Sequence, residues 1–423
     1  MKALVIGSGA REHAIVRGLL DDPDVDSVAA APGNPGIAAV AQCIPLPGGM
    51  TDGEAVAEAA AAAGADLVVI GPEAPLVAGV ADVLRGKGFA VFGPSAQAAR
   101  LEGSKAFAKE IMAAADVPTA RCYVCADRGE AQAALEATGT PYVVKDDGLA
   151  AGKGVVVTDD LEAALDHAQR CFETGGRVVV EEYLDGPEVS LFCITDGRTV
   201  VPLAPAQDFK RVGDGDVGPN TGGMGAYSPL EWAPKDLVDD VVDRIAQPTV
   251  DEMARRGHPF AGVLYVGLAL TSRGPRVIEF NARFGDPETQ VVLARLRTPL
   301  GSLLMAAAQE RLDELPPLHW RPEAAVTVVV ASEGYPAKPV TGGSISGLDD
   351  LDPAYVLHAG TALDDAGALV SSGGRVLSVV ALGEDLEAAR SRAYDAVDKV
   401  TLDGSHHRRD IALKAQRGEV AVP

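Results

Sequence analysis

Residues 144–155 have the sequence VKDDGLAAGKGV, and this segment distinguishes two classes of phosphate-binding loop. A P-loop has four residues between its first glycine and the Gly-Lys pair, then Ser or Thr and a helix. Here three residues separate Gly148 from Gly152, and the run Val155–Thr158 favours a strand. The segment therefore predicts a β-hairpin with a glycine-rich tip that closes over phosphates, and a surface hairpin without a ligand is the alternative. The residues that would meet the phosphates are Lys145, Gly152, Lys153 and Gly154.

Farther along the chain, the heptapeptide VIEFNAR carries a second group of polar residues. Because side chains alternate along a strand, Glu279, Asn281 and Arg283 are predicted to share one face, with Ile278 and Phe280 pointing to the core. A carboxylate beside an amide oxygen suits Mg²⁺, which takes few protein ligands and completes its shell with phosphate and water. Arg283 would then bind a carboxylate or a phosphoryl group. A strand face that merely alternates polar residues is the alternative.

The first hundred residues alternate short apolar runs with amphipathic ones, which is typical of a parallel sheet covered by helices. This pattern predicts a Rossmann-like unit. Its predicted strands are Ala3–Ile6, Ser27–Ala30, Asp66–Ile70 and Ala90–Phe92. Its predicted helices are Arg11–Leu20, Gly53–Ala63, capped by Thr51 or Asp52, and Pro75–Arg85.

The turn Gly7-Ser8-Gly9 follows the first strand and opens a helix, where backbone amides can bind a phosphate. A dinucleotide fingerprint would need a third glycine where Glu12 stands, and an acidic residue at the end of the second strand. A small phosphorylated ligand, a dinucleotide and a purely structural turn all remain open. We expect Arg11 and His13 to face the same region.

Beyond residue 100 the pattern changes to strand pairs and long glycine loops, which predicts an α+β unit. Residues 207–225 are so rich in glycine that we expect a long functional loop. The run VVVEEYL, residues 178–184, with Glu188 beyond it, offers acceptors for an adenine amino group and ribose hydroxyls. Solvated glutamates are the alternative. Two further pairs of predicted elements are the strands Gly262–Leu270 and Arg276–Phe280, and the strand Ala325–Ala331 with the helix Asp385–Val400.

The composition excludes several classes of protein. The 423 residues carry 37 Lys and Arg against 60 Asp and Glu, a net charge of −23, which argues against nucleic-acid and anionic-membrane binding. Five cysteines do not make a disulfide framework, and we interpret the Cys122/Cys125 pair as ordinary thiols. No apolar window approaches the ~20 residues of a membrane span, and the N-terminal apolar run is too short for a signal peptide. We expect a cytoplasmic monomer whose anionic ligands meet local cations.

Several segments, in this order, resemble the ATP-grasp ligases, and among them the phosphoribosylamine-glycine ligase (glycinamide ribonucleotide synthetase) family. Besides the hairpin, the segments are VIGSGAREHA (5–14), GPEAPL (71–76), LEGSK (101–105), GPNTGGMGAYSP (218–229), EFNARFGDPE (279–288) and SGGRVL (372–377). The resemblance implies an α/β and α+β multidomain protein. The implied parts are a Rossmann-like substrate domain (1–100), an ATP-grasp core (101–315) with a mobile subdomain at about 120–187, and a C-terminal α+β domain (323–423).

The resemblance also implies the reaction and the site residues. The family joins glycine to 5-phosphoribosylamine and forms glycinamide ribonucleotide, ADP and phosphate, with Mg²⁺ or Mn²⁺ as the metal. The implied ATP-binding residues are Lys105, Lys145, Gly152, Lys153, Gly154, Glu181, Glu182, Tyr183, Leu184 and Glu188. Glu279 and Asn281 match the metal ligands, and Arg283 and Lys210 are the expected catalytic residues. The expected substrate-binding residues are Gly9, Arg11, Glu73, Asp208, Thr221 and Gly222.

Two residues depart from the family pattern. Asp146 stands where we expect a small residue, beside a predicted phosphate site, although it alternates with Lys145 and would then point away. Phe209 stands where a histidine is common. Two other classes of function remain: a carboxylase or amino-acid ligase with the same ATP chemistry and another acceptor, and a non-catalytic ATP-binding protein. The second class would tolerate the loss of Lys145, Glu279 or Asn281, and all three are present.

Overall fold

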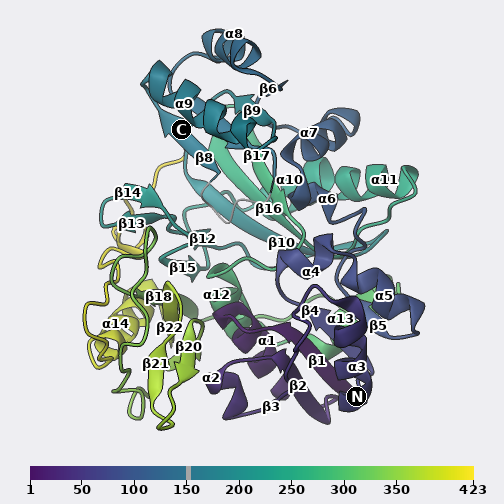
Figure 1. Cartoon of the computed structure of the whole chain (residues 1–423), viewed down its shortest axis with the longest axis vertical. Helices are drawn as coiled ribbons and strands as arrows, with labels where there is room; N and C mark the ends of the chain where they lie inside the picture. The colour runs from purple at the N-terminus through teal and green to yellow at the C-terminus, as the bar shows by residue number, and fades with distance from the viewer. Residues whose placement is uncertain (149–153) are drawn as a thin grey trace.

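The computed structural model describes residues 1–148 and 154–423, and Figure 1 shows its parts arranged around the central strands β10 and β16. The N-terminal part contains a parallel sheet with the strand order β3-β2-β1-β4-β5, which confirms the predicted Rossmann-like unit. Its strands are β1 (Lys2–Gly7), β2 (Ser27–Pro32), β3 (Gln42–Cys43), β4 (Leu67–Ile70) and β5 (Ala90–Phe92). Its helices are α1 (Ala10–Leu20), α2 (Pro35–Ala38), α3 (Gly53–Ala63), α4 (Glu73–Val77) and α5 (Val80–Gly86).

In this part the structure confirms one predicted helix cap and contradicts one predicted helix. Asp52 caps α3, since its carboxylate accepts from the amides of Glu54 and Ala55. The single helix predicted over Pro75–Arg85 is wrong, because α4 ends before Gly79 and α5 begins after it. Gly79 has a φ of 84°, a left-handed conformation that interrupts a helix and that glycine adopts without strain.

The two strands that flank the glycine-rich segment, β7 and β8, lie in a small sheet at the top of Figure 1, with the strand order β6-β9-β7-β8. Strands β7 and β8 pair antiparallel with Lys145 opposite Val155, so the predicted hairpin is confirmed and a P-loop is excluded. Of the run VVVEEYL, only residues 178–181 form a strand. The elements are β6 (Cys122–Cys125), α8 (Arg128–Thr138), β7 (Tyr142–Asp146), β8 (Val155–Thr158), α9 (Leu161–Glu173) and β9 (Val178–Glu181).

The central sheet has the order β11-β10-β16-β17, and the predicted pair of residues 262–280 is its β16/β17 hairpin. The register shifts between Gly267 and Leu268, which face Glu279 and Val277, so Ile278 is the extra residue of a β-bulge. Val277 and Phe280 are therefore both buried, and Ile278 lines a cleft instead of the core. The strands are β10 (Glu188–Asp196), β11 (Val200–Pro202), β16 (Ala261–Thr271) and β17 (Gly274–Asn281).

The C-terminal sheet has the order β12-β15-β18-β22-β19 and takes two strands from the predicted loop at 207–225 and the residues after it. That loop is thus more regular than predicted, because β12 pairs with β15 and β13 pairs with β14. The strands of this sheet are β12 (Gln207–Asp208), β15 (Gly225–Ser228), β18 (Ala324–Ala331), β19 (Tyr355–His358) and β22 (Arg375–Gly383). Two separate two-stranded sheets are formed by β13 (Arg211–Gly213) with β14 (Val217–Asn220), and by β20 (Thr361–Leu363) with β21 (Leu369–Ser371).

The remaining helices cover these sheets and connect them. They are α6 (Arg100–Gly103), α7 (Lys105–Ala114), α10 (Leu237–Val241), the π-helical turn Val242–Ala246, α11 (Gln247–Arg255), α12 (Glu288–Arg295), α13 (Leu300–Ala308), the 3₁₀ turn Leu312–Glu314, α14 (Leu386–Val397) and α15 (Leu413–Gln416). The helix predicted over Asp385–Val400 is α14, with Asp385 as its N-cap. Within the described residues, no helix is long and apolar enough to cross a membrane.

Candidate functional site

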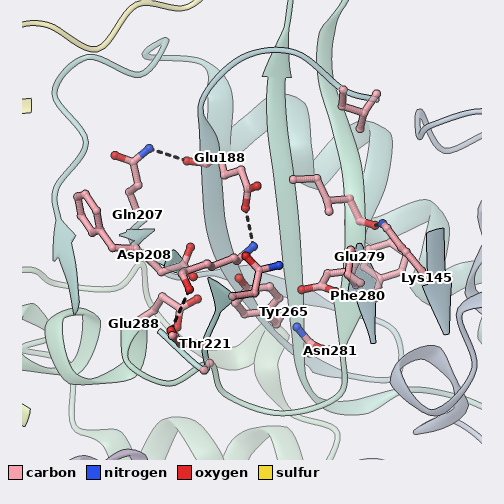
Figure 2. Close-up of a pocket in the computed structure, with 18 of the residues that line it drawn as sticks. Lys145, Glu188, Gln207, Asp208, Thr221, Tyr265, Glu279, Phe280, Asn281 and Glu288 are labelled. Carbon is pink, nitrogen blue, oxygen red and sulfur yellow. Dashed lines mark hydrogen bonds and ion pairs between the residues drawn. The ribbon is translucent and has the colours of Figure 1, made fainter. Parts of the chain in front are cut away.

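A cleft of about 1020 Å³ lies between the parallel N-terminal sheet, the hairpin sheet, the central sheet and the C-terminal part. Most of the predicted site residues line it, although they come from distant segments of the chain (Figure 2). Those residues are Arg11, Glu73, Lys105, Lys145, Gly154, Glu181, Glu182, Tyr183, Leu184, Glu188, Asp208, Lys210, Thr221, Gly222, Glu279, Asn281 and Arg283. Gly9 lines a smaller neighbouring cavity, and Gly152 and Lys153 lie outside the described residues.

Two lysines meet one buried glutamate at the end of the cleft that is formed by β7 and β9. The Glu181 carboxylate receives Lys145 Nζ at 3.0 Å and Lys109 Nζ at 3.2 Å. Lys145 Nζ also donates to the carbonyl of Ile278 at 3.1 Å, an oxygen that belongs to the bulged residue of β17. Sequence reasoning missed Lys109. The signal for it was its position four residues after Lys105, on the same face of α7.

The N-terminus of α7 is joined to the end of β7, and this contact positions Lys105. Asp147 accepts from the Ser104 hydroxyl at 3.0 Å and from the Ala106 amide at 2.7 Å, and it pairs with Arg177. Lys105 Nζ donates to the Gly148 carbonyl at 2.9 Å. Burial lowers the pKa of Lys105, and the nearby Glu279 carboxylate opposes that shift. Lys105 and Lys145 therefore present two cations to the same space.

Glu279 and Asn281 lie on β17 and both face the cleft (Figure 2). Burial opposes ionisation of Glu279, but Lys210, Lys145 and Lys105 outweigh it and hold the pKa of its carboxyl below the usual range. Among the described residues, no group of three His, Cys, Asp or Glu side chains is arranged to hold a metal ion. The ionised carboxylate and the amide oxygen nevertheless fit Mg²⁺ or Mn²⁺, which can take its other ligands from phosphates and water.

Arg283 is held by two glutamates rather than projecting freely. Its Nη2 atom lies 3.1 Å from Glu102, and its Nε atom lies 3.3 Å from Glu73. Glu102 also accepts from the Ala282 amide at 2.8 Å, which fixes the end of β17. Burial lowers the pKa of Arg283, but Glu102 and Glu73 outweigh it, so the guanidinium stays charged. Glu102 lies in the family motif LEGSK but was not predicted as a site residue.

A second set of charged side chains lies where β10 and β12 meet. Lys210 pairs with Glu188, the residue predicted to bind ribose, so Glu188 already has a cationic partner. Burial raises the pKa of Asp208 to about 8; Lys210 opposes that shift, and Glu288 and Glu188 add to it. Asp208 is therefore a carboxyl of this cleft that can exchange a proton near neutral pH.

The smaller cavity, of about 260 Å³, lies between the Ser8-Gly9 turn and the C-terminal part. Arg375 from β22 reaches Asp286 at 3.3 Å and donates to the Gly222 carbonyl at 2.6 Å, and Arg375 and Asp286 line both cavities. The amide of Gly9 is already used, because it donates to Glu12 at 2.7 Å. A phosphate here would rely on Arg375, which sequence reasoning placed in a family motif without a role.

Glu12 explains why a glycine stands at positions 7 and 71. A Cβ atom at Gly7 would lie 2.3 Å from Glu12 Cγ, and one at Gly71 would lie 2.1 Å from Glu12 Oε1. The glycines therefore make room for a buried glutamate that fixes the turn. His13 does not face the cleft with Arg11 as expected; its Nδ1 accepts from the His358 amide at 3.0 Å. Burial lowers the pKa of His13 to about 3.

Asp146 and Phe209, the two residues that depart from the family pattern, each have identifiable contacts in the structure. The Asp146 carboxylate accepts from the Gly148 amide at 3.1 Å, and Asp146 is not among the residues that line the cleft. Phe209 packs beside Tyr227, with the Arg408 guanidinium 4.9 Å from its ring centre. Neither side chain replaces a predicted ATP or metal contact.

Three family models match the chain: the N domain of phosphoribosylglycinamide synthetase at residues 1–102, its ATP-grasp (A) domain at 103–289 and its C domain at 325–414. The chain is 66% identical over 420 residues to the phosphoribosylamine–glycine ligase of Streptomyces coelicolor, covering 98% of this chain and 99% of that protein. A crystal structure of the Thermotoga maritima phosphoribosylamine–glycine ligase is similar with a TM-score of 0.85 and 34% identity, covering 97% of this chain and 100% of the other. A biotin carboxylase from Campylobacter jejuni shares the fold alone, with a TM-score of 0.74 and 14% identity, covering 99% and 97% of the two chains.

Proposed function

The chain belongs to the phosphoribosylglycinamide synthetase family, and on that premise we propose which of its residues perform the family's reaction. The reaction is the ATP-dependent ligation of glycine to 5-phosphoribosylamine in purine biosynthesis, and it forms a carbon–nitrogen bond. The observation that carries the proposal is the convergence of Lys105, Lys145, Glu279 and Asn281 on one cleft. These residue types are the ones that a metal–nucleotide complex requires.

ATP is assigned to the space between β7, β9 and β17. Lys105 and Lys145 neutralise its phosphates, and Glu181 with the backbone of Glu182 to Leu184 borders the adenine. Gly152, Lys153 and Gly154 of the hairpin are assigned to the phosphates on the basis of the family resemblance. Glu279 and Asn281 would hold Mg²⁺ or Mn²⁺, which when bound would supply positive charge that neutralises the phosphates.

Glycine needs activation because a carboxylate is a poor electrophile. In the proposed sequence its carboxylate oxygen attacks the γ-phosphorus, ADP leaves, and the resulting glycyl phosphate is attacked by the amine of phosphoribosylamine. Phosphate leaves in this second step. Arg283, held by Glu73 and Glu102, is positioned to stabilise the transferring phosphoryl group. Lys210 is the second cation on this side of the cleft, beside Asp208 and Glu188.

Phosphoribosylamine is assigned to the junction of the two cavities, beside Gly9, Arg11, Thr221 and Gly222. Arg375 supplies a cation for the ribose phosphate, and Asp208, with its pKa of about 8, is placed to accept the proton that the attacking amine loses as the carbon–nitrogen bond forms. Because Thr221 and Gly222 lie between β14 and β15, they link this junction to the C-terminal sheet. We propose that the protein acts as a cytoplasmic monomer.

The test is turnover with freshly generated phosphoribosylamine, glycine and MgATP, with ADP and glycinamide ribonucleotide measured together. We expect ADP release that depends on both glycine and phosphoribosylamine. Release with another amino acid in place of glycine would favour a different ligase of the same fold. No glycine-dependent release would reject the proposed function.

Glu279→Ala tests the metal assignment within this function. We expect kcat/KM for MgATP to fall by at least ~10³-fold, because the metal and the phosphate charge it neutralises would be lost from the site. The free energy of unfolding should change by less than about 1 kcal/mol, since the carboxylate faces the cleft and not the core. A loss of stability as large as the loss of activity would instead indicate a structural role. Asn281→Asp, which keeps an oxygen ligand, is the matched control.

A further inference from the structure

Lys109 is a buried cation to which neither the family resemblance nor the proposed reaction assigns a role. Only 6% of its surface is exposed, and 2% of the surface of its partner Glu181. Its three ammonium protons have three acceptors: Glu181 at 3.2 Å, the Thr119 hydroxyl at 2.8 Å and the Ala120 carbonyl at 3.3 Å. A buried lysine with a full set of partners is fixed in direction as well as in charge.

The partners of Lys109 belong to different parts of the fold. Lys109 lies on α7, Glu181 ends β9 of the hairpin sheet, and Thr119 lies in the segment that leads into that sheet. The Thr119 hydroxyl in turn donates to the Val277 carbonyl of β17 at 2.6 Å. Lys109 therefore connects the predicted adenine wall to the point where the hairpin sheet joins the central sheet.

The charge balance around Glu181 is unequal, because two lysines share one carboxylate. Lys145 is also the lysine that the proposed function directs to the phosphates. If Glu181 had Lys145 alone, a phosphate that drew this lysine away would leave a buried carboxylate without a counter-ion, which is strongly unfavourable. A second cation removes that conflict. An ionised carboxylate still has lone pairs left to accept from an adenine amino group.

We propose that Lys109 is a positioning residue for the nucleotide: it gives the Glu181 carboxylate a second cationic partner and aligns it at the adenine edge, and thereby leaves Lys145 available to the phosphates. The inference rests on the proposed placement of ATP in this cleft. It assigns Lys109 no contact with the reacting atoms. Its effect should therefore appear in nucleotide binding and base selection more than in the chemical step.

The experiment measures binding of MgADP and MgGDP to the full-length protein by isothermal titration calorimetry. We expect Lys109→Met to weaken MgADP binding by about ten- to a hundredfold and to reduce the preference for adenine over guanine. Lys109→Arg, which keeps the charge, should retain affinity within about threefold. In the double variant Lys109→Met with Glu181→Gln, the amide no longer holds Lys145, so we expect MgADP affinity to recover while the base preference stays low. Lys87→Met, which removes a lysine from an exposed ion pair with Glu54, is the matched control and should change nothing.

Several outcomes would overturn the proposal. Unchanged MgADP affinity in Lys109→Met would overturn it. A loss of MgADP affinity in Lys109→Met that persists in the double variant would also overturn it. If Lys109→Met fails to fold, the double variant decides: MgADP affinity well below the wild-type value in the folded double variant would overturn the proposal, and affinity close to the wild-type value would support it. A wild-type protein that binds MgADP but shows no glycine-dependent turnover would reject the proposed function and leave the role of Lys109 to be judged by binding.

Discussion

Two charge clusters in this molecule, one around the buried Arg408 and one around the buried Glu181, have different balances. The Arg408 guanidinium meets two carboxylates, Asp410 at 2.7 Å and the half-exposed Asp216 at 2.8 Å, and Lys414 lies 3.6 Å from Asp216, so the charges of this cluster balance. Around Glu181 one carboxylate meets two ammonium groups, and the cluster lines the cleft. The Arg408 guanidinium also donates to the Arg211 carbonyl and faces the Phe209 ring, so it is enclosed by protein groups.

The difference indicates which cluster is complete without a ligand. Burial lowers the pKa of Arg408, but its hydrogen bonds to Asp410 and Asp216 outweigh it, so this cluster holds its charge with protein partners alone. The cluster at Glu181 has an excess of positive charge, and Lys105 adds another cation beside it. In a chain with a net charge of −23, such an excess is available for an anion. We conclude that the first cluster serves stability and the second serves binding.

Arg408→Met should have the largest effect on stability. It leaves the largely buried Asp410 without its cation, whereas Asp216 is half-exposed and keeps Lys414 at 3.6 Å, and we expect the free energy of unfolding to fall by about 2 kcal/mol. Urea denaturation measures this, and MgADP affinity should change by less than about threefold. Arg244→Met, which removes an exposed arginine paired with Asp240, is the control, with an expected change below about 0.5 kcal/mol. A large loss of nucleotide affinity without a loss of stability would reverse the distinction between the clusters.

Asp208→Asn should have an intermediate effect that depends on pH. The pKa of Asp208 is raised from 3.8 to about 8 in the folded chain, so the unfolded chain releases this proton first as pH rises. The folded state is therefore favoured below about pH 4 and loses that advantage progressively up to about pH 8.

The variant lacks this penalty because its side chain does not ionise. We expect Asp208→Asn to be more stable than the wild type by about 1–2 kcal/mol at pH 8, a modest figure because Asp208 is partly exposed to the cleft. At pH 5 the difference in stability should be smaller. Urea denaturation at the two pH values measures the difference. Equal stabilities at both would mean that Asp208 titrates normally. Turnover should fall in the same variant, because an amide cannot accept the proton.

Asp146→Ala should have the smallest effect. The carboxylate bonds the Gly148 amide and does not line the cleft, so it belongs to neither charge cluster. We expect the KM for MgATP to change by less than about twofold, and any change to be a decrease because one negative charge is removed. Steady-state kinetics at saturating glycine measure it. A large increase would show that Asp146 has a positive role in nucleotide binding.

Much of the fold was predictable because local patterns determine it. The alternation of strands and helices gave the parallel sheet, and three residues between Gly148 and Gly152 were enough to distinguish a hairpin from a P-loop. The bulge at Ile278 was not predictable, since it depends on how β17 pairs with β16. The strands β12 and β15 were missed because they are short, and they become regular only because β12 pairs with β15 and β15 pairs with β18.

The site was predictable to the extent that its residues lie in recognisable motifs. Lys109, Glu102 and Arg375 were not identified because their importance comes from partners distant in sequence: Glu181, Arg283 and Asp286. Likewise, nothing in the sequence indicated that Glu12 takes the Gly9 amide, or that His13 bonds His358. The roles assigned to the cleft residues stay predictions until the variants are measured.

The sheet shared between β15 and β18 has a consequence for synthesis of the chain. Residues 225–228 leave the ribosome about a hundred residues before their partners 325–328. Until then β12 and β15 have an unpaired edge, and the junction at Thr221 and Gly222 lacks its neighbour Arg375. A nascent chain that pauses near residue 320 would hold the parallel N-terminal sheet and the hairpin sheet complete. It would still lack the wall of the smaller cavity and the C-terminal lining of the larger cleft, so both binding sites would be completed only after the C-terminal sheet has been synthesised.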